Sequence, residues 1–433
     1  VWVEAESFIR KGGWNVDQQF TFEMGSPYLI AHGMGNPVED ASTRVHFPRK
    51  GTYHIYVRTF NWTSPWSGQE GPGRFTLSID GKPLQQTMGH TGNRWMWQYA
   101  GTATVDKEAE VCLHDLTGFD GRCDALWFTT DKDDIPPTED GALETFRQQY
   151  DKSRIRRVEY DFVVVGGGIA GICASVAAAR MGIKVALIND RPIWGGCNSS
   201  ETRVHLGGHI EMEPYPNLGN MIKEFGPLRI GNAQPAEFYE DEKKRAFLEA
   251  EKEHLDLYPS YRVYKTDCRN GKIIAVYARH IESGEIVRFQ APIYSDCTGD
   301  GTVGYLAGAD FAMGREGRNE YNEPSAPQNG DKMTMGASVQ WYSVEDSSAC
   351  AFPVFEYGVN FSDQSCQKVK MGEWTWETGM NRDQCKEFER IRDYGLMVVY
   401  SNWSHLKNRL ANNSEYRNRK LGWVAYIAGK RES

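Results

Sequence analysis

The sequence lacks several patterns that would place it in well-known classes of protein. It contains no run of Lys and Arg, and its 49 basic residues stand against 58 acidic ones, so the formal charge is −9. This balance excludes an extended nucleic-acid-binding surface, which needs clustered positive charge to neutralise phosphates. No stretch of about eighteen uncharged apolar residues occurs, which excludes a membrane-spanning helix.

The cysteines argue against a zinc site and leave one possible disulfide open. No Cys-x-x-Cys pair or His/Cys cluster with zinc spacing occurs, which argues against a structural zinc site. The total of nine is odd, so at least one thiol has no partner within the chain. Cys112 and Cys123 flank a Gly/Asp-rich turn between two apolar runs. They are either a disulfide across a hairpin of an exported protein or two buried free thiols on neighbouring strands.

Neither end of the sequence shows a processing or stop signal. No basic region followed by an apolar one precedes Val1, so any signal peptide was removed or never present. Residues 423–433 read as a helix, and no Gly or Pro follows to stop it. We therefore expect a further C-terminal segment after Ser433.

Tryptophan is unevenly distributed, with seven of the 13 in the first 127 positions. This part also contains short alternating runs separated by Gly, Asn, Asp and Pro turns, for example residues 52–58, 74–79 and 109–113. Spaced strands with one apolar face predict an all-β sandwich over residues 1–130. Residues 131–158 break the pattern with prolines and a charged stretch, which predicts a linker with a short helix.

A strand, a glycine-rich turn and a helix follow one another from residue 161. Residues 161–165 have buried-strand character and lead into Gly-x-Gly-x-x-Gly, an Ala-rich helix over 172–181 and a second strand over 184–188. In this position the glycines allow a tight turn and the close approach of backbone N–H groups to a pyrophosphate. The dinucleotide-binding residues that this motif predicts are Gly166, Gly168, Ile169, Ala170 and Gly171.

An acidic residue that binds the ribose is expected at the end of the second strand, where this sequence has Asn189. An Asn side chain can accept from and donate to ribose hydroxyls. Asp190 takes this role if the strand ends one residue later. We include both residues, with the adjacent Arg191, among the predicted cofactor contacts.

A second element points to the kind of dinucleotide. A long charged helix over residues 235–254 and three strand-like runs lead into Asp296-Cys297-Thr298-Gly299-Asp300. This segment resembles the Ala-Thr-Gly-Asp segment that closes the FAD site in the two-dinucleotide-binding flavoprotein superfamily. The resemblance implies FAD rather than NAD, with contacts from Thr298, Gly299 and Asp300; the alternative is an ordinary Asp-Gly turn.

Residues 194–205 read Trp-Gly-Gly-Cys-Asn-Ser-Ser-Glu-Thr-Arg-Val-His. They resemble the Gly-Gly-Asn-x-Ser-Ser-Glu-x-Arg-Val-His stretch of bacterial FAD-dependent oxidoreductases, a group often mislabelled as xanthan lyases. The resemblance covers residues 158–433 and implies a glutathione-reductase-like α/β Rossmann fold with an inserted substrate region. The flavin contacts that it implies are Gly195, Gly196, Asn198, Ser199 and Arg203. Cys197 stands where the family pattern has Asn.

A flavin accepts a hydride, and the protein contributes a base for the remaining proton. Cys197 has no Cys within the following seventy residues, which argues against a dithiol mechanism. The candidate catalytic residues are His205 and His209, with Glu201 close by. Alternation with apolar residues puts His205 on the same face of an extended segment as Arg203. The alternative for His205 is a hydrogen bond to a backbone carbonyl of the flavin loop, the segment over residues 195–203 that contains the implied flavin contacts.

Three short segments of the first part, residues 3–6, 51–58 and 124–128, resemble the opening, middle and final strands of carbohydrate-binding β-sandwich modules. In those modules two Glu and one Asp hold a structural calcium, a hard cation that prefers oxygen ligands. The corresponding residues here are Glu4, Glu6 and Asp124. The alternative is that they are surface carboxylates on edge strands.

Sugars are bound by flat aromatic faces, with polar groups fixing the hydroxyls. Trp62 and Trp66 lie in a loop rich in Asn, Ser, Pro and Gly, and Trp95 and Trp97 lie in another. We expect these loop rings to be exposed and to contact a ligand or another domain, with Trp62, Trp66 and Trp95 as the substrate-binding candidates. The tryptophans in strand-like runs, expected in the core, are Trp2, Trp14 and Trp127.

These patterns predict an exported bacterial FAD-dependent oxidoreductase that oxidises a hydroxyl group of a carbohydrate or glycoside. The flavin fold is assigned to residues 159–433, and the calcium-bearing, glycan-binding module to residues 1–130. The alternative is a glycan-binding protein whose flavin fold is incomplete and does not catalyse. A flavin monooxygenase would need a second dinucleotide-binding motif for NAD(P)H, and we assign none outside the segments already given to FAD. Lyase activity has no support in the sequence beyond the family label.

Overall fold

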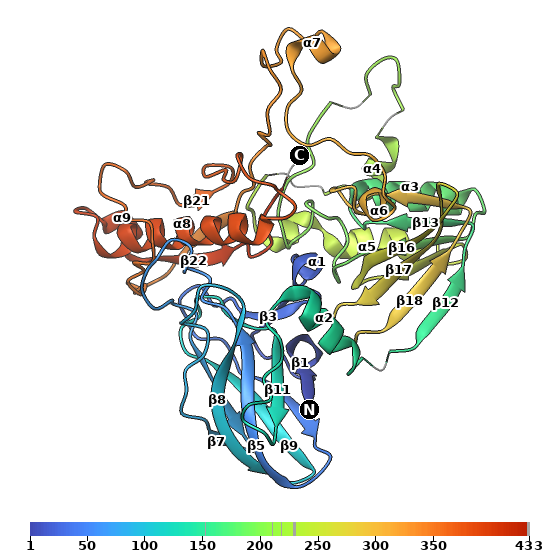
Figure 1. The fold of residues 1–433 in the computed structure, drawn as a ribbon. Helices are drawn as coiled ribbons and strands as arrows, with labels where there is room; N and C mark the ends of the chain where they lie inside the picture. Colours follow the sequence, from blue (N-terminus) through green and yellow to red (C-terminus); the bar gives the residue numbers. More distant parts are fainter. Residues whose placement is uncertain (152, 210, 218, 228–230, 431–433) are drawn as a thin grey trace. The chain divides into compact units, whose positions relative to one another are not determined.

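The computed structural model describes residues 1–151, 153–209, 211–217, 219–227 and 231–430 (Figure 1). The chain divides into two compact units, and neither is one continuous stretch of sequence. Unit 1 comprises Val1–Lys152, Ser343–Lys370 and Asp393–Tyr426. Unit 2 comprises Ser153–Tyr342, Met371–Arg392 and Ile427–Ser433. Among the described residues, none of the helices has the length and apolar character needed to cross a bilayer.

The first part of unit 1 is all-β, as the sequence predicted, with short helical turns at η1 (Ala5–Ser7) and α1 (Thr21–Met24). Its two larger sheets are antiparallel. One has the order β1 (Trp2–Glu4), β11 (Ala125–Thr129), β5 (Gly51–Thr59), β8 (Met96–Val105). The other has the order β4 (Ala41–His46), β9 (Glu108–Asp115), β6 (Phe75–Ile79), β7 (Lys82–Pro83). Both sheets contribute to one apolar core, which is the arrangement of a sandwich.

A third sheet of unit 1 has the order β10 (Gly121–Cys123), β3 (Tyr28–Ala31), β2 (Asn15–Asp17). Cys123 on β10 is fully buried, whereas Cys112 on β9 is partly exposed. Among the cysteines that the structure describes, none is bridged, so the expected alternative of a Cys112–Cys123 disulfide is wrong and two free thiols stand in its place.

The stretch expected to be a linker contains one helix, α2 (Asp140–Gln148). Leu143 on this helix is only 1% exposed and packs in a cluster with Trp97 and Trp127 of the sheet. Trp2 stacks on Tyr150, just after the helix, with ring centroids 6.2 Å apart. Helix α2 is therefore packed on the sandwich as part of unit 1, because its apolar side chains and the sheet's aromatic rings cover each other.

Unit 1 is completed by segments from far along the chain. They include residues of the long helix α8 (Phe388–Asn408), the short helix α9 (Ser414–Arg417) and strand β22 (Arg419–Val424). Trp403 and Leu406 of α8 are fully buried. The helix expected over residues 423–433 is wrong: residues 423 and 424 end a strand, and residues 425–430 are not helical. Residues 431–433 lie outside the described residues.

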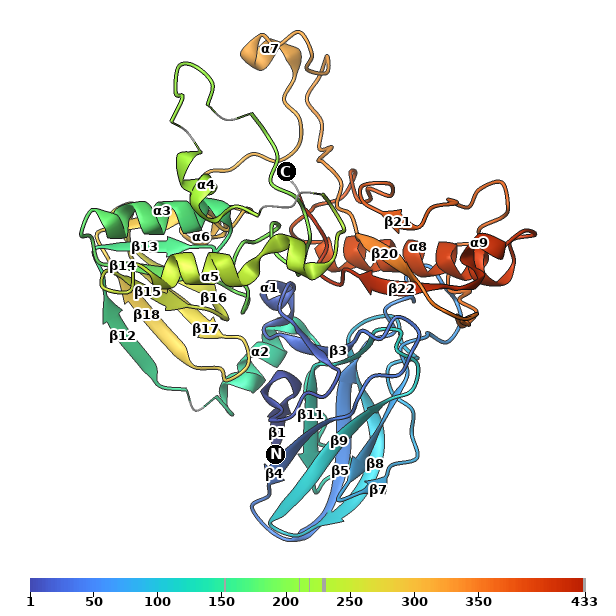
Figure 2. The same ribbon diagram turned by 180° about the vertical axis from the view of Figure 1, so that it is seen from behind.

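Unit 2 is built on a parallel sheet with the order β15 (Leu255–Tyr258), β14 (Val185–Ile188), β13 (Phe162–Val165), β19 (Ile293–Asp296) (Figure 2). A second sheet contains β12 (Ile155–Glu159) and the meander of β16 (Tyr261–Arg269), β17 (Lys272–His280) and β18 (Ile286–Gln290). The expected strand–helix–strand unit and meander are confirmed.

Alternate residues of β13 explain the three layers of this fold. Val163 and Val165 join a core cluster with the meander sheet, whereas Val164 joins a cluster with Ile172 and Val176 of α3 (Ile169–Arg180). Because successive side chains of a strand point to opposite faces, one face of the parallel sheet packs on the second sheet and the other on helices.

Several remaining elements of unit 2 differ from the sequence expectations. The long helix expected over residues 235–254 is instead a short η2 (Ala236–Tyr239) followed by α5 (Asp241–Glu249). Glu240 between them has a φ of 47°, outside the right-handed helical region, and interrupts the helix. The other elements are α4 (Asn220–Phe225), α6 (Thr302–Leu306), α7 (Arg318–Tyr321), β20 (Trp341–Glu345) and β21 (Met371–Gly372).

Candidate functional site

The turn from β13 to α3 contains the predicted glycine motif. Gly166 has a φ of 108°, and a Cβ there would lie 2.1 Å from the carbonyl oxygen of Cys297. A Cβ on Gly171 would lie 1.8 Å from the Gly166 carbonyl oxygen. Gly168 differs, because the nearest atom to a Cβ there is the Cα of Gly196 at 3.9 Å. The outer glycines are needed by the turn itself, whereas the middle one borders open space.

Helix α3 starts at Ile169, directly after Gly168, and no side chain caps it. The first N–H groups of a helix have no partner inside the helix, and the helix dipole makes this end positive. An uncapped N-terminus after a glycine turn is suited to a phosphate. The predicted residues Ile169 and Ala170 form the first turn of this helix.

A second glycine turn follows β14 and pairs with the first. Gly195 has a φ of 119° and donates its N–H to the Gly167 carbonyl at 2.8 Å. Asn198 is 4% exposed and donates from Nδ2 to the Val204 carbonyl at 2.8 Å. Within the described part of the chain, its buried Oδ1 has no hydrogen-bond partner. Ser199 is fully buried and donates from Oγ to the Gly196 carbonyl at 2.7 Å.

The structure gives Asn189 a structural role that the sequence did not indicate. Its Oδ1 accepts from the Gly167 N–H at 3.1 Å, and its Nδ2 donates to the carbonyls of Arg191 and Ile193 at 2.8 and 2.9 Å. The side chain is 4% exposed and ties the motif turn to the loop after β14. Asp190 pairs with Arg262 at 2.9 Å, and a ribose contact by either residue stays a prediction.

The segment after β19 adds a third turn. The Asp296 Oδ1 accepts from the N–H and Oγ of Thr298 at 3.1 and 2.7 Å. A Cβ on Gly299 would meet nothing within 4 Å, so the space beside this glycine is also open. The Asp300 Oδ2 accepts from the Lys430 Nζ at 2.6 Å, a partner that the sequence did not reveal.

These turns fit FAD. The open side of Gly168, the uncapped helix and the unpartnered Asn198 oxygen lie in two turns that hydrogen-bond to each other. Backbone N–H groups of the first turn suit the phosphates, and Asn198 Oδ1 offers an acceptor for an N–H or hydroxyl group of a ligand. The Arg203 guanidinium donates to the carbonyls of Ser200 and Gln234 at 2.8 and 3.2 Å, and its contact with the flavin stays a prediction.

Among the candidate bases, His205 has a defined set of partners. The backbone N–H of His205 donates to Oδ1 of Asn232 at 3.0 Å, and its Nδ1 lies 2.8 Å from the same oxygen. The Asn232 Nδ2 donates to Oε2 of Glu373 at 3.2 Å. The expected alternative, a bond from the ring to a flavin-loop carbonyl, is therefore not what the structure shows. His209 is exposed.

Glu201 lies against Arg191, with Oε2 3.5 Å from Nε and a side chain 14% exposed. Burial raises its pKa to about 7, with a further rise from the charges of Asp190 and Asp241, although Arg191 opposes it. Lys244 is fully buried and donates from Nζ to the Tyr239 carbonyl. Burial lowers the pKa of Lys244 to about 8.

In unit 1, the predicted calcium ligands face arginines. Asp124 is fully buried, and its Oδ2 lies 2.8 Å from Nη1 of Arg58 and 2.5 Å from Nη2 of Arg147. Glu4 lies 3.5 Å from Arg147. Among the described residues, no group of three or more His, Cys, Asp and Glu is arranged to hold a metal. The three carboxylates do not fit calcium, because guanidinium groups already supply the positive charge.

The pKa values agree with this arrangement. Burial raises the pKa of Glu6 well above its ordinary value, as do the nearby charges of Glu4 and Asp124, although Arg147 opposes them. Burial also acts to raise the pKa of Asp124, but Arg147 and Arg58 outweigh it and the pKa is lowered. The expectation of surface carboxylates is wrong for Glu6 and Asp124, which are 5% and 0% exposed.

The loop tryptophans are less exposed than expected. Trp62 is fully buried, donates from Nε1 to the Phe119 carbonyl at 3.0 Å and stacks on Phe355. It therefore has no free face for a sugar. Trp97 is 8% exposed and also belongs to the core. Trp66 and Trp95 are partly exposed, and their role as substrate contacts stays a prediction. Of the tryptophans expected in the core, Trp14 and Trp127 are buried and Trp2 is partly exposed.

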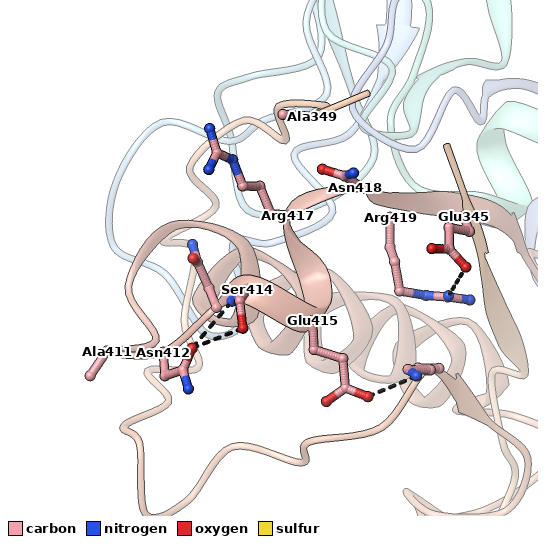
Figure 3. Close-up of a pocket in the computed structure, with 11 residues that line it drawn as sticks. Glu345, Ala349, Ala411, Asn412, Ser414, Glu415, Arg417, Asn418 and Arg419 are labelled. Atoms are coloured by element: carbon pink, nitrogen blue, oxygen red, sulfur yellow. Dashed lines mark hydrogen bonds and ion pairs between the residues drawn. The ribbon is translucent and has the colours of Figure 1, made fainter. Parts of the chain in front are cut away.

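Unit 1 also has a polar depression of about 760 Å³ (Figure 3). Lys370 pairs with Glu415 across it at 2.7 Å, and Arg419 lies 3.8 Å from Glu345. Its other lining residues are Ala349, Ala411, Asn412, Asn413, Ser414, Arg417 and Asn418. None of the residues predicted from the sequence lines it.

Comparison with known proteins gives one extensive match. A family profile described as FAD dependent oxidoreductase matches residues 161–433. The aerobic glycerol-3-phosphate dehydrogenase of Staphylococcus aureus (strain NCTC 8325) is 39% identical over 67 residues, which is 16% of this chain and 12% of that protein. The chain thus aligns with only a small part of this curated relative.

Two solved structures resemble parts of the chain weakly. The Mycobacterium smegmatis Sdh1 complex is 17% identical with a TM-score of 0.27, over 34% of this chain and 35% of that one. A family 35 carbohydrate binding module from Clostridium thermocellum is 19% identical with a TM-score of 0.23, over 30% of this chain and 98% of that one. At these scores neither likeness carries an argument about fold or function.

Proposed function

Because the chain belongs to the FAD dependent oxidoreductase family, whose profile spans residues 161–433, we propose that unit 2 binds FAD and oxidises a hydroxyl group by hydride transfer. The observation that carries this proposal is the pair of glycine turns, in which Gly168 is open beside the uncapped N-terminus of α3. This geometry suits the diphosphate of a dinucleotide.

The reaction has two parts that this chain must serve. Bound FAD supplies the hydride acceptor for the C–H bond that breaks. His205 removes the proton of the hydroxyl group, and the electron pair of the O–H bond forms the carbonyl of the product. Glu201, whose pKa burial raises to about 7, is our second candidate for carrying this proton.

We propose a carbohydrate or glycoside as the substrate class, with the β-sandwich of unit 1 as the glycan-binding part. The partial exposure of Trp66 and Trp95 supports this role, since exposed aromatic rings stack on sugars. The resemblance of residues 1–130 to carbohydrate-binding modules further leads us to propose that the protein is exported from a bacterial cell. sn-Glycerol 3-phosphate is the competing substrate, from the name of the curated relative.

Anaerobic titration of the FAD-loaded protein tests this proposal. The expected result is a bound flavin whose oxidised absorbance is bleached by one of a panel of monosaccharides, disaccharides and methyl glycosides. If sn-glycerol 3-phosphate alone bleached the flavin, it would be the substrate in place of a carbohydrate or glycoside. Glycan binding with no FAD bound after reconstitution would overturn the oxidoreductase and favour the non-catalytic alternative. The matched control is Gly168→Val, which fills the open side of the turn.

Mass spectrometry of the denatured, FAD-loaded protein adds a separate test at the flavin loop. Cys197 is exposed beside Gly196, so its thiol is available for a covalent bond to a ligand. A chain mass increased by one FAD in the native sequence, and not in Cys197→Ser, would place the flavin against this loop covalently. The unmodified mass with FAD released would give a non-covalent site.

A further inference from the structure

The contacts of His205 determine which of its ring nitrogens carries the proton. A backbone N–H is always a donor, so the atom of Asn232 that meets the His205 N–H at 3.0 Å must be its carbonyl oxygen. Glu373 supports the same orientation from the other end, because an ionised carboxylate only accepts and therefore faces the amide nitrogen at 3.2 Å. The orientation of the Asn232 amide is thus fixed twice.

The same oxygen lies 2.8 Å from Nδ1 of His205. An oxygen of an amide cannot donate, so Nδ1 must be the donor in this contact and the neutral ring is protonated there. The other nitrogen, Nε2, then carries the lone pair. A Cβ on Gly207 would lie 3.0 Å from Nε2, so the absence of a side chain at this position keeps the nitrogen accessible.

We infer that Asn232, oriented by Glu373, holds His205 as the Nδ1-protonated tautomer and thereby makes Nε2 the proton acceptor of the oxidation. Asn232 and Glu373 are positioning residues, which act on the substrate only through His205. The inference rests on the proposed role of His205 as the base. It adds two residues from distant parts of unit 2 that no motif connects to the histidine.

Burial and hydrogen bonds of the surrounding backbone hold the Asn232 side chain in place. Asn232 is 6% exposed, and its backbone carbonyl accepts from Nε2 of Gln234 at 3.1 Å. The next residue, Ala233, donates its N–H to the Gln340 side chain at 3.0 Å. These contacts fix the backbone that carries the Asn232 amide, so the amide can hold His205 without losing much conformational entropy.

The test measures the tautomer directly by ¹⁵N NMR of histidine side chains in ¹⁵N-histidine-labelled protein, without FAD and at a pH where the ring is neutral. The His205 signals are identified by their loss in His205→Gln. We expect protonated Nδ1 and unprotonated Nε2 in the native chain. In Asn232→Ala, the ratio of the Nδ1-protonated to the Nε2-protonated form falls about fivefold or more, since one hydrogen bond is lost.

A double variant exchanges the amide and the carboxylate between positions 232 and 373 and should keep the same hydrogen bonds. In Asn232→Asp with Glu373→Gln, the new carboxylate accepts from both His205 donors and the new amide donates to the carboxylate, so the native tautomer is restored. The matched control is Asn220→Ala, an exposed asparagine of the same region bonded to Asn217. An Nε2-protonated ring in the native chain, or an unchanged ratio in Asn232→Ala, overturns the inference.

The base role of His205 and the positioning role of Asn232 and Glu373 can be disproved independently of each other. If a saccharide reduces the FAD-loaded protein, His205→Gln should slow that reduction about 100-fold or more. Reduction at the native rate in this variant would remove the base role of His205 even if the tautomer is as expected. The wrong tautomer in the native chain would remove the positioning role of Asn232 and Glu373 even if His205→Gln is slow.

Discussion

Arg122 donates from both Nη atoms to the two carboxylate oxygens of Asp393, at 2.9 and 2.6 Å, although 271 residues separate the two in sequence. Both side chains are buried within unit 1, and the Arg122 guanidinium also lies 5.7 Å from the ring centre of Trp62. The pair therefore joins strand β10 to helix α8 through a bidentate, water-excluded contact.

Removing one member of this pair should be costly. Arg122→Ala leaves the Asp393 carboxylate buried without its counter-charge, and we expect the free energy of unfolding to fall by about 3–5 kcal/mol. Urea unfolding followed by tryptophan fluorescence measures the change. Arg44→Ala is the control, since Arg44 is 69% exposed beside Glu108, and it should cost less than about 0.5 kcal/mol. Similar midpoints for the two variants would contradict the prediction.

The acidic cluster of unit 1 should depend on Arg147 and not on calcium. Arg147→Ala leaves Asp124 and Glu4 with one guanidinium fewer, and we expect the unfolding free energy to fall by about 3–5 kcal/mol. Differential scanning calorimetry with and without a calcium chelator should give the native chain one Tm. A Tm that drops on chelation would restore the calcium site. Gln148→Ala, an exposed change on the same helix, is the control.

Glu201 should make the protein less stable as pH rises. Its folded pKa of about 7 lies above the ordinary 4.5, so the folded state binds more protons between these values and loses stability as they leave. The loss grows to about 3 kcal/mol above the folded pKa. Glu201→Gln should therefore be more stable than the native chain at about pH 8 and equal to it at about pH 4. Parallel pH profiles of the two proteins in urea unfolding would exclude this role of Glu201.

Two glycines of the motif should separate cofactor binding from folding. Gly168→Ala adds a methyl group to open space, so we expect the stability of the apoprotein to change by less than about 0.5 kcal/mol while the Kd for FAD rises about tenfold or more. Gly171→Ala places a Cβ against the Gly166 carbonyl and should lower both stability and binding. Fluorescence titration with FAD and thermal unfolding check the two effects. Equal FAD affinity in Gly168→Ala and the native chain would show that the open side does not face the cofactor.

The elements that the sequence predicted well depend on local patterns. Strand β13, the glycine turn and helix α3 follow from buried-strand character, required positive φ and an Ala-rich stretch within about 20 residues. The same holds for the meander, whose turns carry Asn270-Gly271 and Ser283-Gly284. Such features are visible because each is stabilised by residues close in sequence.

The features that the sequence missed depend on distant partners. Trp62 lies in a polar loop, and its burial depends on partners distant in sequence, among them the Phe355 ring. Arg147 lies in a charged stretch that resembles a linker, and its role is set by Asp124 in the sheet. Asn232 and Glu373 are 141 residues apart and carry no motif, so the contacts that link Glu373 to Asn232 and Asn232 to His205 had no signal in the sequence.

The separation of Arg122 and Asp393 also has a consequence for biosynthesis. Ribosomes add about 5–20 residues per second, so the 271 intervening residues take roughly 15–55 s to make. Unit 1 can therefore acquire its full set of contacts only after most of unit 2 has been synthesised.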